Sequence, residues 1–453
     1  MILPKNIEKL IVPPPESFKG PLSAKTYDKK LGIEVFLHCL TSGLVAERLL
    51  KKDILSIQAL NWINQNIPLN IIPFLIACHD VGKLSPGFQA MLRHFLGWVE
   101  FSDYNDISKY GTIKHEVISY CHMKSLIGAD ISKVLLFHHG KYRHTNNDHE
   151  YKTYQCTGID EADNWYKLRS DLVSKLANCF KIESIPLIDI KDVTFLKYFG
   201  GLLCVCDWIS SDESFFSPSG YEIKDIPNII EGAFNKYDFF RTDFSSILDM
   251  PFKEVFFKDQ KEQYDPNPIQ KAMIDNIQGP GLYILEAPMG IGKTEAALYP
   301  AFDLCRKGIT DGIYFAMPTQ VTSNRIFVRM QKALENWFKK DNLHLIHGCA
   351  DIFHNPKEDD WFKGNKRAIL DEFGTGTVDQ VLLGVLPQAK FFFLRTFGMY
   401  RKVVIFDEVH SYSIYTSGLI KTLIKELIKM DCVVIILTAT LTDRLREELL
   451  NAV

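Results

Sequence analysis

The hydrophobic pattern changes its period once along the chain, and this change limits the possible folds more than any other feature. In the first half, apolar residues recur every three or four positions, as on one face of a helix, in the stretches 30–50, 70–84, 115–126, 131–140 and 193–211. From about residue 280, short β-rich runs each precede a helix-length amphipathic stretch; they lie at 281–287, 312–318, 402–408 and 432–440. Alternation of strand and helix predicts a parallel sheet. The sequence therefore predicts a multidomain chain, with an all-α helical lobe followed by an α/β lobe.

The boundary between the two lobes falls where the chain is charged and has no strong period, between residues 240 and 265. We expect a helical domain over residues 1–245, a linker over 246–265 and an α/β domain over 266–453. The length of 453 residues suits about two to four domains of ordinary size.

Composition narrows the class of protein. An apolar fraction of 46% with 24% charged residues is ordinary for a globular protein and excludes wholesale disorder. We find no apolar run of the ~18–20 residues that cross a bilayer, and no signal-peptide pattern at the start. Ten cysteines without a C-x-x-C pair are typical of reduced core thiols, which favours the cytoplasm. A net charge of −3 neither requires nor excludes nucleic acid, because a basic groove can lie on a neutral protein.

A phosphate-binding loop is predicted between a strand and a helix, in LEAPMGIGKTEAAL. Gly290 and Gly292 let the backbone curl so that its N–H groups face phosphate oxygens. Lys293 reaches the β- and γ-phosphates, and the Thr294 hydroxyl can bind Mg²⁺. Ala287 stands where the usual motif has its first glycine. This variant resembles the form used by superfamily 2 helicases.

Two carboxylates follow another predicted strand, in KVVIFDEVH. Asp407 is expected to face the Mg²⁺ ion and Glu408 the attacking water. A single acidic residue at the end of a strand is common and needs no catalytic role. Their place downstream of a phosphate loop, in the tetrad that ends at His410, favours the nucleotide site.

Further segments resemble helicase motifs in the right order. Gln270 stands where the family's adenine-reading glutamine lies, and residues 438–440 resemble the motif that couples hydrolysis to strand movement. Residues 318–324 and 374–382 resemble the motifs that contact single-stranded nucleic acid, where Arg325 suits a phosphate contact. By this resemblance the α/β lobe is a RecA-like lobe that binds ATP with Mg²⁺. Such motors bind ATP between two lobes. The sequence ends at Val453 without a second lobe, so we expect this chain to bind ATP without robust hydrolysis or unwinding.

Histidines crowd the first third of the chain, which holds nine of the 13. Histidine is the commonest metal ligand, so the crowding suggests a metal site, against chance clustering on loops. The dyad His79-Asp80 ends an apolar helix and is followed by Lys83, which can hold a phosphate. Other candidate ligands also lie on or beside apolar helical stretches, which a helix bundle can point to one centre: His38, His115, His138, His139 and Asp207. Ser210 and Ser211 share a helix face with Asp207.

Together these residues resemble the HD superfamily of phosphohydrolases. The number of ligands suits two ions that clamp both oxygens of an in-line displacement at phosphorus. Asp80 is expected to bridge the ions and, with Lys83, to act in catalysis. We assign His38, His79 and Asp207 to the first ion. The second ion takes His115, His138 and His139. Histidine and carboxylate ligands suit Mn, Fe, Co, Ni or Zn better than Mg. The other early histidines are interpreted as bystanders: His94, His122, His144 and His149.

The combination of an HD lobe ahead of a superfamily 2 motor resembles the CRISPR-associated helicase–nuclease family of type I systems, over about residues 20–450. The resemblance implies that the HD lobe nicks and degrades single-stranded DNA with transition metals. It also implies that the motor moves 3′ to 5′ along DNA with ATP, and that the full-length protein partners the Cascade surveillance complex. We expect no membrane as a partner. Two alternatives stay open: an HD-type nucleotide phosphohydrolase, and a catalytically idle DNA-binding module.

Overall fold

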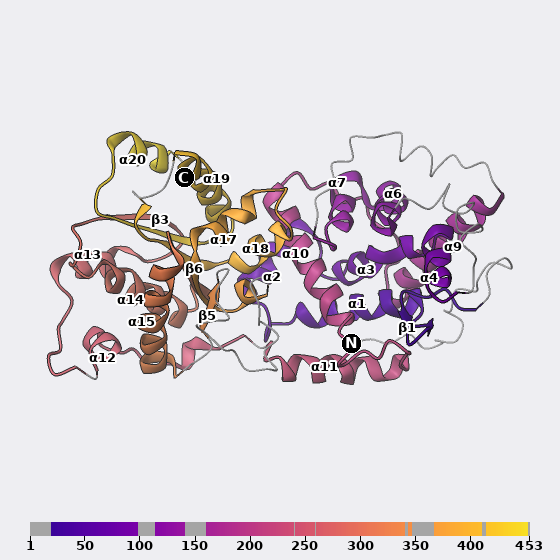
Figure 1. Ribbon diagram of the computed structural model, residues 1–453, viewed down its shortest axis with the longest axis horizontal. Helices are drawn as coiled ribbons and strands as arrows, with labels where there is room; N and C mark the ends of the chain where they lie inside the picture. Colours follow the sequence, from indigo (N-terminus) through magenta and orange to yellow (C-terminus); the bar gives the residue numbers. More distant parts are fainter. Residues whose placement is uncertain are drawn as a thin grey trace. The chain divides into compact units, whose positions relative to one another are not determined.

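The computed structural model describes residues 20–97, 114–140, 160–239, 241–258, 260–339, 343–346, 367–409 and 414–451. The chain divides into two compact units, Met1–Phe240 and Arg241–Val453. Figure 1 draws the first unit in indigo to magenta and the second in pink to yellow. The expected boundaries at residues 245 and 265 stay a prediction, and this division favours an earlier one.

The first unit is helical. A short antiparallel pair, β1 (Thr26–Tyr27) and β2 (Lys30–Leu31), precedes its helices. The α-helices are α1 (Val35–Leu49), α2 (Ile57–Asn66), α3 (Ile72–Ala77), α4 (Pro86–Phe95), α6 (His115–Ile127), α7 (Ala129–Ser132), α9 (Asp160–Cys179), α10 (Val193–Ser210) and α11 (Ile226–Lys236). The 3₁₀ helices are η2 (Cys78–Lys83), η3 (Lys133–Leu136) and η4 (Ile223–Asp225).

Helices α1 and α10 form the centre of this unit and pack against each other. Nearly every residue of α1 is buried. Asp192 caps α10, because its side chain accepts hydrogen bonds from the backbone N–H groups of Thr194 and Phe195. Among the described residues, α10 is the single helix long and apolar enough to span a membrane, and 78% of it is buried inside the protein, as is common for a core helix.

The apolar helix that was expected to end at His79-Asp80 is shorter in the structure. Helix α3 ends at Ala77 and continues as the 3₁₀ helix η2, in which Asp80 has the non-helical angles φ −112° and ψ 17°. Successive side chains on a regular helix diverge by about 100°. The kink at Asp80 lets His79 and Asp80, although adjacent, face the same centre.

The second unit is built on six parallel strands in the order β3-β8-β7-β4-β6-β5. The strands are β3 (Gly281–Glu286), β4 (Gly312–Met317), β5 (Leu343–Ile346), β6 (Phe373–Thr377), β7 (Lys402–Phe406) and β8 (Val433–Thr438). The helices are η5 (Phe244–Ser246), α12 (Phe252–Phe256), α13 (Pro268–Asn276), α14 (Lys293–Arg306), α15 (Gln320–Phe338), η6 (Ala368–Leu370), α17 (Val378–Leu382), η7 (Leu383–Val385), α18 (Phe392–Met399), α19 (Ile414–Lys429) and α20 (Asp443–Leu450). This arrangement confirms the predicted α/β lobe with a parallel sheet.

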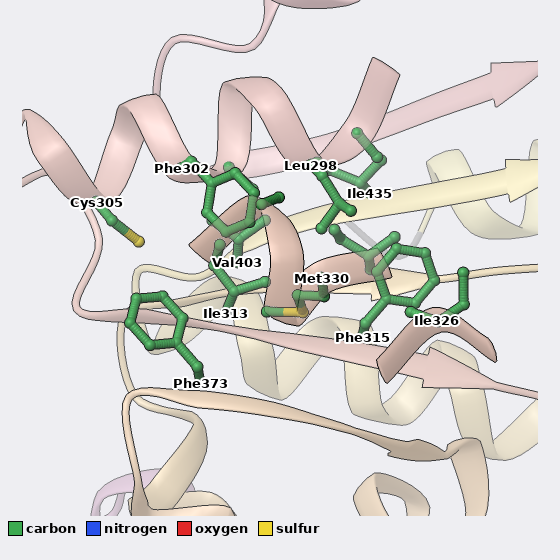
Figure 2. Packing of buried hydrophobic residues seen from close by; sticks show 14 of the residues in the cluster. Leu298, Phe302, Cys305, Ile313, Phe315, Ile326, Met330, Phe373, Val403 and Ile435 are labelled. Carbon is green, nitrogen blue, oxygen red and sulfur yellow. The ribbon is translucent and has the colours of Figure 1, made fainter. Parts of the chain in front are cut away.

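The core of this unit lies between the sheet and helices α14 and α15. In Figure 2 the side chains of Leu298 and Phe302 from α14 point toward the strands, which contribute Ile313, Val403 and Ile435 to the same cluster. The segment before residue 265 also contributes to this core. Phe244 is 2% exposed, and Val255 is 1% exposed. These contacts favour a second unit that begins near residue 241.

Candidate metal centre and nucleotide site

The predicted metal ligands of the first unit come from five separate segments and converge on one buried centre. The segments contribute His38 from α1, His79 and Asp80 from η2, His115 from the start of α6, His138 and His139 after η3, and Asp207 from α10. These residues fall into two groups of potential metal donors, and in each group one donor atom per residue lies within 4.8 Å of the others. The groups coincide with the two ligand sets expected from the sequence.

The first group contains His38, His79, Asp80 and Asp207. His38 Nε2 lies 2.9 Å from Asp80 Oδ2 and 3.7 Å from Asp207 Oδ1. His79 Nε2 lies 3.2 Å and 3.5 Å from the same two oxygen atoms. Ser211 donates a hydrogen bond of 3.2 Å to Asp207 Oδ1 and so orients this carboxylate. Two imidazoles and two carboxylates are a donor set that transition metals favour.

The second group contains His115, His138 and His139. His139 Nε2 is 2.9 Å from His115 Nε2. The other oxygen of Asp80 faces this group, since Oδ1 lies 3.2 Å from His115 Nε2 and 3.4 Å from His138 Nε2. The carboxylate of Asp80 therefore presents one oxygen to each group, which is the geometry of a bridging ligand.

Several buried atoms of this centre lack hydrogen bonds within the described part of the chain: His79 Nε2, His138 Nε2 and Asp80 Oδ1. The opposite ring nitrogens face backbone carbonyls, with His79 Nδ1 2.9 Å from Ile76 O and His138 Nδ1 2.8 Å from Leu135 O. A carbonyl only accepts, so Nδ1 carries the proton and Nε2 is left for a metal. Buried polar atoms without partners are costly. The residues present therefore fit a metal centre.

Charge in this centre supports the same interpretation. Burial opposes a charged His79, but the interactions of its ring with Asp80 and Asp207 together outweigh burial and raise the pKa of His79 to about 10. The negative charge of the same two carboxylates would attract a metal cation. Burial, followed by the charge of Lys83, lowers the pKa of His38 to about 4, which leaves a neutral imidazole at pH 7. Lys83 Nζ lies 2.7 Å from Asp80 Oδ2.

The predicted nucleotide residues of the second unit lie at the carboxyl edge of the sheet. The phosphate loop follows β3, and Asp407 follows β7; β8 lies between these strands. Lys293 Nζ donates a hydrogen bond of 2.8 Å to Ala287 O across the loop. Burial, followed by the charge of Glu408, raises the pKa of Asp407 to about 6. Carboxyl ends of parallel strands are the common place for ligands in such folds.

Other predicted residues take separate places. Residues 318–324 contain Thr319, the N-cap of α15, and Arg325 is exposed on that helix. Residues 374–382 form β6 and α17. Thr438 ends β8 and donates a hydrogen bond of 2.9 Å to Thr440 O. Of the expected bystanders, His122 is buried and His94 is partly buried. His144, His149 and His410 lie outside the described residues.

Sequence reasoning missed two residues beside the phosphate loop. Asn267 binds the loop backbone through its side-chain amide, which donates to Ile291 O at 3.0 Å. Arg329 of α15 forms an ion pair with Glu295 and lies 3.4 Å from the Thr294 hydroxyl. The pattern N-P-x-Q is a recognisable capping box and could have indicated Asn267. No pattern in the sequence indicates Arg329.

Two family models match the chain, one for each unit. The model "Cas3, HD domain" matches residues 24–216, and the model "DEAD/DEAH box helicase" matches residues 267–448. A relative from Thermus thermophilus, described as a CRISPR-associated endonuclease/helicase Cas3, is 30% identical over 435 residues, which cover 83% of this chain and 44% of that protein.

Solved structures have the same fold. A crystal structure of T. fusca Cas3 with AMPPNP matches 95% of this chain and 51% of its own, with a TM-score of 0.76 and 24% identity. A chain in a CRISPR RNA-guided surveillance complex, pre-nicking, matches 95% of this chain and 49% of its own, with a TM-score of 0.65 and 23% identity. This chain spans about half the length of these proteins.

Proposed function

The chain belongs to the Cas3 family of CRISPR-associated nuclease–helicases, and on this premise we propose that its first unit cleaves single-stranded DNA with divalent metals. The second unit is the first, ATP-binding lobe of a 3′-to-5′ helicase motor. The observation that carries the proposal is the carboxylate of Asp80, which faces one donor group with each oxygen. The protein also partners a CRISPR surveillance complex, and the likeness to a chain in such a complex supports this part.

The ligands of two ions follow from the two donor groups. His38, His79 and Asp207 hold the first ion, while His115, His138 and His139 hold the second. Asp80 bridges them. Two ions of Mn, Fe, Co, Ni or Zn supply Lewis acidity at the phosphorus of the scissile phosphodiester. Lys83, beside Asp80, holds a non-bridging phosphate oxygen and offsets its developing charge.

The second unit binds ATP with Mg²⁺ through the phosphate loop. Lys293, which donates to Ala287 O in this structure, would bind the β- and γ-phosphates, and Thr294 and Asp407 would hold Mg²⁺. Glu408 orients the attacking water. Gly290 and Gly292 both have φ +81° and so present backbone N–H groups to the phosphates.

Cleavage of circular single-stranded DNA by this chain with Mn²⁺ or Ni²⁺, without ATP, tests the proposal. We expect endonucleolytic degradation by the unaltered chain and a loss of about a hundredfold to a thousandfold in Asp80→Ala, since removal of one electrostatic group from a catalytic centre costs ~10²–10³ in rate. Asp225→Ala, at an exposed carboxylate, is the matched control and should cleave normally. Lys293→Ala should also cleave normally, because cleavage needs no ATP.

The alternatives give different outcomes in the same assay. Intact DNA with turnover of free nucleotides would support an HD-type nucleotide phosphohydrolase. Inertness with every metal tested would leave a catalytically idle DNA-binding module. A large loss of cleavage in Lys293→Ala would contradict the division of labour between the two units.

A further inference from the structure

The amino end of helix α13 lies against the phosphate loop, and its first residues form a capping box. Asn267 is the N-cap, and its Oδ1 accepts a hydrogen bond of 2.9 Å from Gln270 N. In return, Gln270 Oε1 accepts a hydrogen bond of 2.9 Å from Asn267 N. Both side-chain oxygens are thus used within the helix end, as in other capping boxes.

The amino groups of the same two side chains bind the loop. Asn267 Nδ2 donates to Ile291 O at 3.0 Å, and Gln270 Nε2 donates to Gly292 O at 3.1 Å. Gln270 is 7% exposed, so its bond is shielded from water. Two consecutive carbonyls of the phosphate loop are therefore held by two amides of one rigid helix end.

These bonds fix the direction of the loop's N–H groups. In a trans peptide the C=O and N–H groups point to opposite sides. Holding the carbonyls of Ile291 and Gly292 toward α13 therefore turns the N–H groups of Gly292 and Lys293 away from it. A curled loop with its N–H groups aligned on one side is an anion-binding concavity. A Cβ on Gly292 would lie 2.4 Å from Gln270 Nε2, so the contact also requires glycine there.

We infer that Asn267 and Gln270 are positioning residues that hold the phosphate loop in its anion-binding shape. The inference rests on the proposed nucleotide site and deepens it. The family resemblance gives Gln270 the role of an adenine reader. The two hydrogen bonds from Asn267 and Gln270 to the loop carbonyls, here called the latch, act instead on the binding of the phosphates of any nucleotide. Loss of the latch therefore weakens the binding of a ligand without a base as much as the binding of ATP.

Two neutral variants remove the two bonds to the loop, and the first of them leaves the helix cap in place. Asn267→Ser keeps an N-cap oxygen but removes the donor to Ile291 O. Gln270→Met keeps length and charge but removes the donor to Gly292 O, together with the acceptor of the Asn267 N–H. Isothermal titration with Mg²⁺-ATP and with Mg²⁺-tripolyphosphate, which has no base, measures both affinities. We expect each variant to bind both ligands about fivefold more weakly, as loss of one hydrogen bond predicts. Thr442→Ala, which loses the N-cap of α20, should lower Tm and keep both affinities.

The outcomes distinguish the inference from the proposed function. Unchanged tripolyphosphate affinity in Asn267→Ser or Gln270→Met overturns the latch. A loss in Gln270→Met for ATP alone assigns that residue to the base and overturns the latch, while the nucleotide site stands. Absence of binding by the unaltered chain overturns the nucleotide site itself and the latch with it. Equal losses for both ligands, at an unchanged Tm in Asn267→Ser, support the latch.

Discussion

Gly82 sets how closely helix α6 approaches the candidate metal centre. Its N–H donates a hydrogen bond of 2.9 Å to Ser119 Oγ on that helix. A Cβ at this position would lie 2.0 Å from His115 O and 2.7 Å from Ser119 N, both of them backbone atoms. Backbone cannot turn aside as a side chain does. The proposed ligand His115 therefore reaches Asp80 because residue 82 has no side chain.

Gly82→Ala should therefore destabilise the first unit by about 2 kcal/mol, the usual cost of overpacking, and should weaken metal binding by displacing His115. Urea unfolding and metal titration measure the two effects. Gly232→Ala is the matched control, because no atom lies within 4 Å of a Cβ there. Alanine in the interior of α11 should stabilise the chain by up to about 1 kcal/mol. Equal effects of the two substitutions would contradict the argument.

The raised pKa of Asp407 should make the proposed nucleotide binding depend on pH. Below about pH 6 this carboxyl is protonated and cannot hold Mg²⁺, so the Kd for Mg²⁺-ATP should rise by up to about tenfold per pH unit. Titrations between pH 5 and pH 8 measure this. Asp407→Asn, with no charge to lose, should bind weakly and show only the pH dependence of the ligand itself. An identical pH profile in the two proteins would overturn the assignment.

The sign of the stability effect follows from the same shift. The pKa of Asp407 is higher in the folded chain than the ordinary value near 3.8. Its contribution to stability is therefore complete below pH 3.8 and is lost as the pH rises through about 6. At pH 7 without Mg²⁺, Asp407→Asn should raise Tm by about 2–4 °C, the shift expected for 1 kcal/mol in a unit of this size. An unchanged or lower Tm would contradict this sign.

At the residue scale, the sequence indicates which side chains can bind a metal but not how they meet. Histidine and aspartate beside apolar helical stretches give the candidate donors. The shared position of Asp80 depends on its non-helical angles, and no periodic pattern carries that information. The approach of His115 depends on Gly82, whose requirement arises from a helix distant in sequence. The ligand roles themselves stay predictions until metal is measured.

At the scale of elements, the segment after residue 240 is part of the second unit. Thr242 donates to the Glu372 carboxylate through its backbone N–H at 2.7 Å and its hydroxyl at 2.6 Å. The Phe244 ring contacts Phe338 and Phe373, with ring centroids 5.1 Å and 5.6 Å apart. A segment with these contacts stabilises the unit to which it binds.

Phe244→Ala should accordingly destabilise the second unit by about 3–5 kcal/mol, as loss of a buried phenylalanine does. Leu248→Ala is the control, because its side chain is 85% exposed while its carbonyl still accepts from Trp337 Nε1. Thermal unfolding of the two variants gives the comparison. Equal stabilities would place the segment outside the core and support a linker there.

Elements with a strong hydrophobic period were predictable, and short ones were not. The expected strands at 281–287, 312–318, 402–408 and 432–440 all form in the structure. Strands β5 and β6 did not stand out, because β5 has four residues and β6 is the glycine-containing run FGTGT. Their place in the sheet comes from pairing with β4 and from burial, which a single short segment does not reveal.

At the scale of the molecule, each unit has its own core and its own candidate site. Ligand binding to a folded unit stabilises that unit alone by mass action. Calorimetry should therefore show two unfolding transitions. Mn²⁺ or Ni²⁺ should raise the Tm of one transition and Mg²⁺-ATP that of the other, each by about 5–10 °C at a ligand concentration near 100 times Kd.

Single-site variants assign the transitions. Asp80→Ala should abolish the shift by metal and keep the shift by Mg²⁺-ATP, and Lys293→Ala should do the reverse. A single transition that both ligands raise would contradict two separate units.

The proposed metal ligands are spread along the chain from His38 to Asp207, and this spread has a consequence for synthesis. A ribosome delivers Asp207 last, near the end of the helix that packs against α1. A nascent chain that stops before α10 lacks the carboxylate of Asp207. It also lacks the helix that packs against α1, which carries the ligand His38. The proposed nuclease centre would thus stay inert during translation until the helical unit is nearly complete.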